Sequence, residues 1–391
     1  MKVSRRNFIK YCIGSAAALG LDLSVVGALE KTLAAGGGPP VIWLAAANCT
    51  GCTVSLANRI SSSHPTDVAD LLINTVNLTY HPNLMGAAGS QAVQTLRNAS
   101  KTSGSFILAV EGGVPTAFGG RACMLFTENG QDVTALSAIR DLASRAKAVL
   151  SVGTCASYGG IPGGAPNPTA VKSVQAATGK NTINIPGCPA HPDWIVWTIA
   201  QLLAGTIPAL DSLRRPKALY GKAVHSECPR RNQPWASDIG IEGQCLQDLG
   251  CKGQNTYADC STRKWNNAAN WCVGANAICI GCTGNGFPDK VSPFYSTAGA
   301  YPPGHPSEGT TTHCSQCHGS GGQLPAGHPD TDGQSCTSCH GSGGAGSLPS
   351  DHPSIGSQSC TSCHSSSGQT LPPGHPATNG KSCSSCHGDD D

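Results

Sequence analysis

The sequence has little that marks a nucleic-acid-binding or membrane-spanning protein. Lys and Arg total 25 against 23 Asp and Glu, a formal net charge of +2, so neither a nucleic acid nor an acidic membrane surface is an indicated partner. One segment, from about Tyr11 to Leu29, approaches the ~20 apolar residues that cross a bilayer, and Asp22 interrupts it. The length of 391 residues allows two or three domains.

The end of the chain lacks the residues of an apolar core. Residues 301–391 contain three Leu, one Ile and one Tyr but no Val, Phe, Trp or Met. A segment of this composition stays disordered unless bound groups supply apolar surface and cross-links. We therefore expect this part to have little secondary structure and to be organised by cofactors.

The same segment contains one motif four times, a His-Pro, then six or seven residues, then C-x-x-C-H. The C-x-x-C-H residues are Cys314, Cys317 and His318; Cys336, Cys339 and His340; Cys360, Cys363 and His364; and Cys383, Cys386 and His387. This motif is typical of covalent c-type haem attachment, with two thiols for the porphyrin and one axial imidazole. The motif histidines follow one another at steps of 22, 24 and 23 residues, which indicates a repeat rather than chance.

Each repeat also offers a second axial ligand in its His-Pro. These histidines are His305, His328, His352 and His375, and His313 could replace the first of them. An iron with two imidazole ligands has no open position, so the repeats predict four haems that transfer electrons. The alternatives are four small zinc sites or a disordered tail.

The beginning of the chain carries an export signal. Residues Ser4 to Lys10 read S-R-R-N-F-I-K ahead of the apolar stretch, a pattern typical of a twin-arginine signal peptide. The small residues around Ala34 to Gly38 indicate a cleavage region, so residues 1–35 are predicted to be removed. The sequence thus predicts a periplasmic protein, associated with a membrane only through partners; the alternative is an uncleaved anchor.

Residues 36–215 show an α/β pattern. Helices are predicted at Gln131 to Ala146 and Asp193 to Leu203. Short apolar runs predict strands at Val41–Ala47, Leu71–Leu78, Phe106–Val110, Ala148–Val152 and Thr182–Ile185. Buried strands that alternate with helices favour a flavodoxin-like, doubly wound parallel sheet.

Three of these predicted strands run into cysteines. The cysteines are Cys49, Cys52, Cys155 and Cys188. Ligands of open α/β sheets bind at the carboxyl ends of the strands, so we expect these four thiolates to meet there and hold a [4Fe-4S] cluster. The alternative is that they are ordinary buried cysteines, which is our interpretation of Cys123.

Residues 216–300 are predicted to form an irregular domain organised by metal. Seven Cys and one His lie between residues 225 and 282: His225, Cys228, Cys245, Cys251, Cys260, Cys272, Cys279 and Cys282. Eight ligands suit two further iron-sulfur clusters, or zinc. Spacing alone does not divide them into two sets.

Several short motifs occur in a characteristic order. They are Cys49-Thr50-Gly51-Cys52, Val152-Gly153-Thr154-Cys155-Ala156, Tyr158-Gly159-Gly160, Pro186-Gly187-Cys188-Pro189, Asp259-Cys260 and Cys279-Ile280-Gly281-Cys282. From about Val41 to Tyr295, the chain resembles the small subunit of nickel-iron hydrogenases. Asn270-Trp271-Cys272-Val273 and the segment from Phe287 to Tyr295 look like the nickel-iron-selenium branch.

The resemblance implies which residues hold which cluster. Cys49, Cys52, Cys155 and Cys188 would hold the proximal [4Fe-4S] cluster; His225, Cys228, Cys245 and Cys251 the distal [4Fe-4S] cluster; and Cys260, Cys279 and Cys282 the medial one. Many members have a [3Fe-4S] medial cluster with Pro where this chain has Cys272, so the fourth thiol predicts [4Fe-4S].

The resemblance also shows a departure that affects proton transfer. The residue before the first cysteine is often Glu in this family, but here it is Asn48, which cannot titrate. A proton route must use another group, and Glu111 is a speculative candidate.

We therefore interpret the chain as the electron-transfer subunit of a periplasmic uptake hydrogenase. The obligate partner would be a large subunit with the nickel-iron site, and this chain would have no catalytic residue of its own. Electrons would pass through three iron-sulfur clusters and four haems to a periplasmic or membrane multihaem cytochrome. The alternatives are an electron carrier not coupled to hydrogen and a non-enzymatic zinc-binding protein.

Overall fold

The computed structural model describes residues 38–62, 65–74, 76–292 and 294, together with residues 22, 24, 25 and 28. The chain divides into two units, residues 1–299 and 300–391, and the described residues all belong to the first. The predicted twin-arginine motif and all four predicted haem motifs lie outside the described residues. Among those described, no helix has the length and apolar character to cross a membrane.

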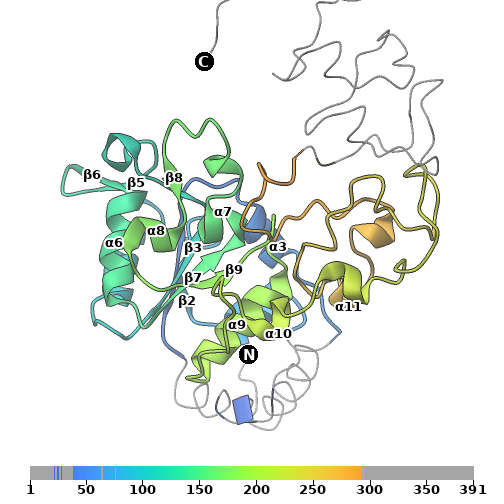
Figure 1. The fold of residues 1–391 in the computed structure, drawn as a ribbon. Helices are drawn as coiled ribbons and strands as arrows, with labels where there is room; N and C mark the ends of the chain where they lie inside the picture. Colours follow the sequence, from blue (N-terminus) through green and yellow to red (C-terminus); the bar gives the residue numbers. More distant parts are fainter. Residues whose placement is uncertain are drawn as a thin grey trace, which may run out of the picture. The chain divides into compact units, whose positions relative to one another are not determined.

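A five-stranded sheet lies at the centre of the fold (Figure 1). The strands are β1 (Val41–Ala45), β2 (Leu78–Tyr80), β3 (Ile107–Glu111), β7 (Ala148–Val152) and β9 (Ile183–Ile185). Their spatial order is β2-β1-β3-β7-β9, and every neighbouring pair is parallel. This is the flavodoxin-like strand order, and the predicted α/β fold with a parallel sheet is confirmed.

Helices cover both faces of the sheet, which is why most strand residues on both sides are apolar. On β1, Val41 and Trp43 pack on one side, against α3 (Gly51–Ala57) and α9 (Pro192–Leu203). Ile42 and Leu44 pack on the other side. That second core includes residues of α5 (Gly89–Ala99), α6 (Ala135–Arg145) and α8 (Val174–Thr178).

The strand predicted for Leu71 to Leu78 is wrong over its first half. Residues Val68–Asn74 form the helix α4, and the strand β2 begins only at the end of the predicted segment. Local hydrogen bonds explain the helix: the Asp70 backbone N–H donates to Asp67 Oδ1 over 2.9 Å, and the Thr66 backbone N–H donates to Asp70 Oδ2 over 2.8 Å. These two carboxylates satisfy N–H groups that a helix start leaves unpaired.

The helix predicted for Gln131 to Ala146 begins too early. Its first four residues are strand β6 (Gln131–Thr134), which pairs in antiparallel fashion with β5 (Met124–Glu128). Asn129 and Gly130 form the two-residue turn between them, both with positive φ, of 52° and 74°. Such a turn favours Asn-Gly because both positions need left-handed backbone.

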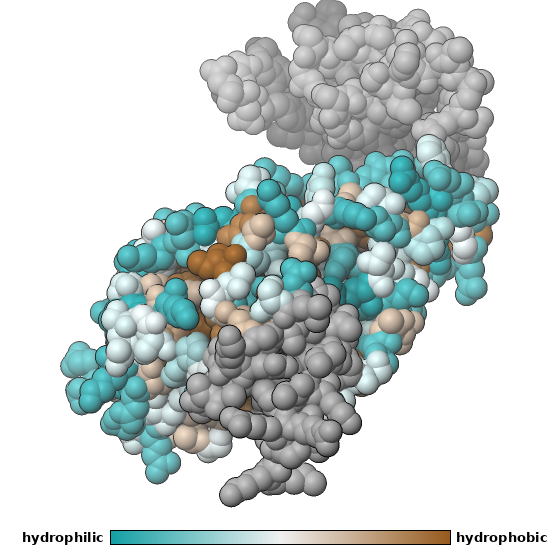
Figure 2. Space-filling model, turned by 90° about the horizontal axis from the view of Figure 1, so that it is seen from below, coloured by the Kyte–Doolittle hydropathy of each residue, from teal (hydrophilic) through white to brown (hydrophobic). Residues whose placement is uncertain are grey.

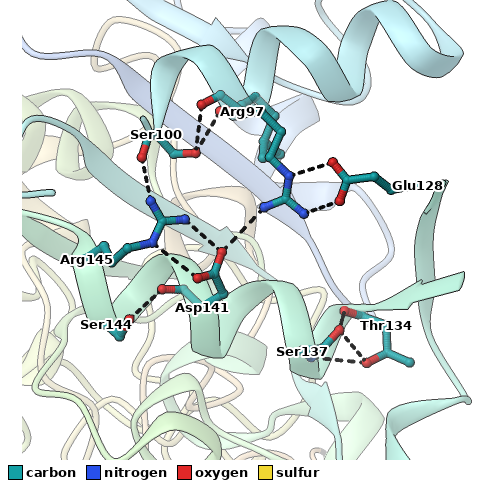
Figure 3. Close-up of polar contacts among 9 residues, drawn as sticks. Arg97, Ser100, Glu128, Thr134, Ser137, Asp141, Ser144 and Arg145 are labelled. Atoms are coloured by element: carbon teal, nitrogen blue, oxygen red, sulfur yellow. Dashed lines mark hydrogen bonds and ion pairs between the residues drawn. The ribbon is translucent and has the colours of Figure 1, made fainter. Parts of the chain in front are cut away.

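Charged side chains fix this hairpin to two helices (Figure 3). Arg97 of α5 forms a double hydrogen bond with Glu128 of β5, with N···O distances of 2.9 and 2.6 Å. Asp141 of α6 accepts from Arg97 and from Arg145. The bonds from Arg97 lower the pKa of Glu128. Because these groups are partly exposed, solvent screens the pair and its contribution to stability is small.

The polypeptide after α10 (Lys217–Tyr220) has short helices and turns. The described segment 221–292 contains α11 (Cys260–Arg263) and two 3-10 turns, Val224–Glu227 and Val273–Ala275. Buried residues such as Trp271 belong to the same core as α9, so this segment packs on one face of the sheet. Two strand pieces, β4 (Val114–Pro115) and β8 (Val171–Lys172), form a separate small ladder, and α7 (Gly153–Tyr158) follows β7 directly.

Candidate metal centres

The first cysteine group comprises the four cysteines that follow sheet strands. Cys49 lies in the turn from β1 into α3, Cys52 lies in the first turn of α3, Cys155 lies in α7 after β7, and Cys188 lies after β9. All these strands are parallel, so their carboxyl ends share one edge. Besides burial, the neighbouring thiols of Cys188 and Cys49 raise the pKa of Cys155. Those of Cys155 and Cys188 raise the pKa of Cys52. The structure therefore brings the four thiols together.

Glycine backbone lies against the sulfur atoms of this group. A Cβ on Gly153 would lie 2.5 Å from Cys52 Sγ, and one on Gly160 would lie 2.8 Å from Cys155 Sγ. Both glycines also have positive φ, of 84° and 54°. The backbone can approach a sulfur-ligated group this closely only without side chains.

Burial makes the thiols of Cys52, Cys155 and Cys188 hard to ionise on their own. It is the main cause that raises the pKa of Cys155 to about 12, and neighbouring Cys188 adds to it. Burial likewise raises the pKa of Cys188. The described cysteines of this group form no disulfides. Four converging thiols, three of them with raised pKa values, suit a cationic metal core, which ionises its ligands on binding. The residues present thus fit an iron-sulfur cluster.

Glu111, at the end of β3, orders the loop that carries two of these thiols. Its Oε1 accepts hydrogen bonds from the backbone N–H groups of Cys52 (3.0 Å) and Thr53 (3.2 Å). Its Oε2 accepts from Trp43 Nε1 (3.1 Å) and from the Thr53 hydroxyl. Four donors occupy the acceptor positions of the carboxylate. These contacts favour a fixed acceptor over the proton carrier that the sequence suggested.

His81 extends this polar network into the core. The Asn83 backbone N–H donates to its Nδ1 over 3.1 Å, which places the ring proton on Nε2, 3.4 Å from Thr53 Oγ1. The ring stacks on Trp43 with 5.1 Å between centroids. Burial lowers the pKa of His81 to about 4, so the imidazole is neutral at physiological pH.

Asn48 has a local structural contact. Its Oδ1 accepts from the Thr50 backbone N–H over 3.1 Å, and Thr50 has left-handed backbone with φ 59°. The amide nitrogen of Asn48 is buried with no hydrogen-bond partner among the described residues. The side chain thus helps to shape the Cys49 turn.

The second cysteine group lies in the irregular segment. It comprises Cys260 at the start of α11, Cys272 before the second 3-10 turn, Cys279 and Cys282. Electrostatic interactions connect Cys260 with the other three, and Cys282 with Cys279 and Cys272. Burial raises the pKa of Cys279 to about 11 and that of Cys282 to about 12. Cys272 therefore lies near the other three thiols, and it also interacts with Cys251.

The third group comprises His225, Cys228, Cys245 and Cys251. Burial raises the pKa of Cys228, and the neighbouring thiols of Cys251 and Cys245 raise it further. Gly253 connects His225 to them: a Cβ on Gly253 would lie 3.6 Å from both Cys251 Sγ and His225 Cβ. The His225 backbone N–H donates to the Gly253 carbonyl over 3.0 Å. The loops that carry His225 and the three cysteines thus lie beside one another.

The three groups adjoin one another in a fixed order. Cys282 of the second group interacts with Cys188 of the first. The Cys279 backbone N–H of the second group donates to Cys251 Sγ of the third over 3.4 Å. Cys123 belongs to none of the three groups. It is partly buried and packs against the core on the opposite face of the sheet, which agrees with its interpretation as an ordinary core cysteine.

A flavodoxin-like sheet with cysteines gathered at its carboxyl edge, followed by an irregular cysteine-rich segment, is typical of iron-sulfur electron-transfer proteins. Residues 49–202 match the family described as NADH ubiquinone oxidoreductase, 20 Kd subunit. Residues 220–295 match the family described as the C-terminal region of the NiFe/NiFeSe hydrogenase small subunit. These two matches cover the sheet and the irregular segment.

Known hydrogenase small subunits are similar to this chain over most of its length. It is 40% identical over 318 residues to the periplasmic [NiFeSe] hydrogenase small subunit of Desulfomicrobium baculatum, covering 75% of this chain and 99% of the relative. It is 38% identical to the periplasmic [NiFe] hydrogenase small subunit of Solidesulfovibrio fructosivorans, covering 75% of this chain and 93% of that one. Its fold matches a [NiFeSe] hydrogenase structure from Desulfovibrio vulgaris Hildenborough, with TM-score 0.63, 39% identity and 66% and 98% of the two chains covered.

The chain therefore belongs to the family of NiFe and NiFeSe hydrogenase small subunits. Hydrogenase small subunits pair with a large subunit, and iron-sulfur clusters are expected in them. Three of the relatives are named as periplasmic proteins, which is consistent with the predicted periplasmic location. The matched family regions end at residue 295, so the predicted haem motifs lie beyond them.

Proposed function

We propose that this protein carries electrons from hydrogen oxidation at a large-subunit nickel-iron site, through three iron-sulfur clusters and four c-type haems, to a periplasmic or membrane multihaem cytochrome. The first, second and third groups are the proximal, medial and distal cluster sites. When bound, the clusters supply one-electron carriers. The observation that carries the proposal is the order of the groups, in which each adjoins the next.

The side of the first group suits the large subunit. Val54, two residues after Cys52, is 50% exposed, and Ile161, which follows Gly160 beside the Cys155 sulfur, is 53% exposed. Apolar side chains exposed beside a buried metal site are typical of a surface that another protein covers. Figure 2 shows one face of the molecule, where hydrophobic side chains gather within an otherwise hydrophilic surface.

The third group suits the outlet of electrons. Trp235 is 57% exposed and forms an isolated bridge with Cys245, and the Ala236 backbone N–H donates to the Cys245 carbonyl over 2.8 Å. A ligand-bearing loop with an exposed aromatic side chain gives a redox partner short access to the third group. We infer that electrons leave the iron-sulfur clusters from this group.

The second group favours a [4Fe-4S] cluster. A cubane keeps all four irons when each has a protein ligand, and Cys272 supplies the fourth thiol beside Cys260, Cys279 and Cys282. We also assign residues 1–35 to a twin-arginine signal peptide, since a protein with buried clusters is exported after folding.

Deletion of residues 301–391 tests the outlet. The truncated protein, produced with its large subunit, should oxidise hydrogen with a small dye at the full rate, whereas reduction of a multihaem cytochrome should fall by at least about tenfold, equivalent to about 1.4 kcal/mol in the barrier. The double variant Cys336→Ala and Cys339→Ala is the matched control, because it removes one haem site and keeps the chain length.

The amounts of iron, nickel and covalent haem in the same preparations complete the test. Haem absorption should be absent from the truncated protein and reduced in the double variant. Equal cytochrome reduction by all three proteins would refute the outlet. A colourless complex that contains zinc would refute the whole electron route.

A further inference from the structure

Thr154 connects backbone segments of two cysteine groups. It is 1% exposed and lies directly before Cys155 in α7. Its backbone N–H donates to the Gly187 carbonyl over 3.0 Å, and the Gly187 N–H donates to Thr154 Oγ1 over 2.8 Å. Its hydroxyl donates to the carbonyl of Cys282. One side chain therefore contacts the residue before Cys188, in the first group, and a ligand of the second group.

The junction between the first and second groups therefore consists of hydrogen bonds between their loops. The Gly187 N–H donates to Thr154 Oγ1, and the Thr154 hydroxyl donates to the Cys282 carbonyl.

The next junction has the same construction. The Cys279 N–H donates to Cys251 Sγ over 3.4 Å, and the Lys252 N–H donates to the Cys279 carbonyl over 2.7 Å. Here a second backbone hydrogen bond aligns the two loops. At the first junction the corresponding support comes from the side chain of Thr154.

We propose that Thr154 is a positioning residue that holds the Cys282 loop against the Cys188 loop and thereby fixes the separation between the proximal and medial sites. This rests on the proposed function, because it takes both groups as cluster ligands. Without the hydroxyl, the buried Gly187 N–H and Cys282 carbonyl lose their partner. Buried groups of this kind are costly to leave unpaired, so the Cys282 loop moves away from Cys188.

Two substitutions separate the hydroxyl from the shape of the side chain. Thr154→Val keeps the branched shape and removes the hydrogen bonds, whereas Thr154→Ser keeps the hydroxyl and loses a methyl group. Each is studied in the whole complex with the large subunit. The readouts are the magnetic interaction between reduced proximal and medial clusters in electron paramagnetic resonance, and the rate at which a chelator removes medial iron.

With Thr154→Val, the magnetic interaction should weaken and medial iron should be released about tenfold faster, equivalent to about 1.4 kcal/mol. Thr154→Ser should match the parent complex in both readouts. If the Val complex does not accumulate, Thr154→Ala takes its place in the same comparison with Thr154→Ser.

A hydroxyl-free variant with parent-like readouts would overturn the inference, and so would a Ser variant as defective as the Val or Ala variant. Absence of iron-sulfur signals from the parent complex would instead refute the proposed function itself. The two failures are therefore distinguishable.

Discussion

Glu111 accepts a hydrogen bond of 3.0 Å from the backbone N–H of Cys52, a residue 59 positions earlier in the chain. Glu111→Gln keeps the shape but leaves one oxygen and one NH2 group among donors from Cys52, Thr53 and Trp43. At least one buried donor then lacks an acceptor, at a cost of roughly 1–3 kcal/mol. The variant complex should unfold at a lower temperature in calorimetry, and the proximal cluster should be easier to reduce because a nearby negative charge is gone.

Glu128→Gln is the matched control for this prediction. It also removes a carboxylate charge from a hydrogen-bonded pair, with Arg97, but its partners lie on α5 rather than near a cysteine (Figure 3). It should leave the reduction potential of the proximal cluster unchanged in a redox titration. A potential that shifts equally in both variants, or in neither, contradicts the role given to Glu111.

Gly153→Ala should remove the cluster from the first group. The new Cβ would lie 2.5 Å from Cys52 Sγ, at a backbone φ of 84°. Left-handed backbone alone costs an alanine roughly 1–2 kcal/mol, and the overlap with sulfur adds to it. The ratio of iron to nickel in the purified complex should fall by the iron of about one cluster.

Gly205→Ala separates backbone strain from the overlap with sulfur. Gly205 has a similar φ of 79° but nothing within 4 Å of the added Cβ. This variant should lose some thermal stability and keep its full iron content. If both variants keep full iron, the close approach at Gly153 has no importance for the cluster.

The sheet was predictable because its signals are local. Four of the five predicted strands coincide closely with observed strands of the sheet, since buried parallel strands are short apolar runs. The helix α4 was missed although Asp67 and Asp70 are placed to pair with the N–H groups at its start. The β5–β6 hairpin was missed although Asn129-Gly130 is a strong turn signal. In both places apolar or helical periodicity was given more weight than the capping and turn residues.

The division of the eight ligands in the irregular segment was not available from spacing. Cys251 and Cys260 are nine positions apart in the sequence but belong to different groups, whereas His225 and Cys251 meet around Gly253. Such pairings depend on how loops with few helices fold over one another. The resemblance to a family supplied the division, and the division stays a prediction.

Cys272→Ser should convert the medial cluster from [4Fe-4S] to [3Fe-4S]. The second group would keep three thiols, and a cubane corner without a strong protein ligand loses its iron. The oxidised complex should then show the electron paramagnetic resonance signal of a [3Fe-4S] cluster, which the parent lacks. Cys123→Ser is the control, because Cys123 lies beside the core away from all three groups; the same signal in the parent would show that Cys272 is not a ligand.

Acidification should destabilise the protein partly through His81. Burial lowers its pKa from 6.5 to about 4, so between these values the unfolded chain binds a proton that the folded chain does not. Stability is therefore lost as pH falls from 6.5 through about 4, by up to about 3 kcal/mol. His81→Asn offers a carbonyl oxygen to the Asn83 N–H and has no titrating ring, so its thermal midpoint should be lower near neutral pH but fall less steeply towards pH 4. Parallel falls in both proteins would show that His81 ionises freely in the folded state.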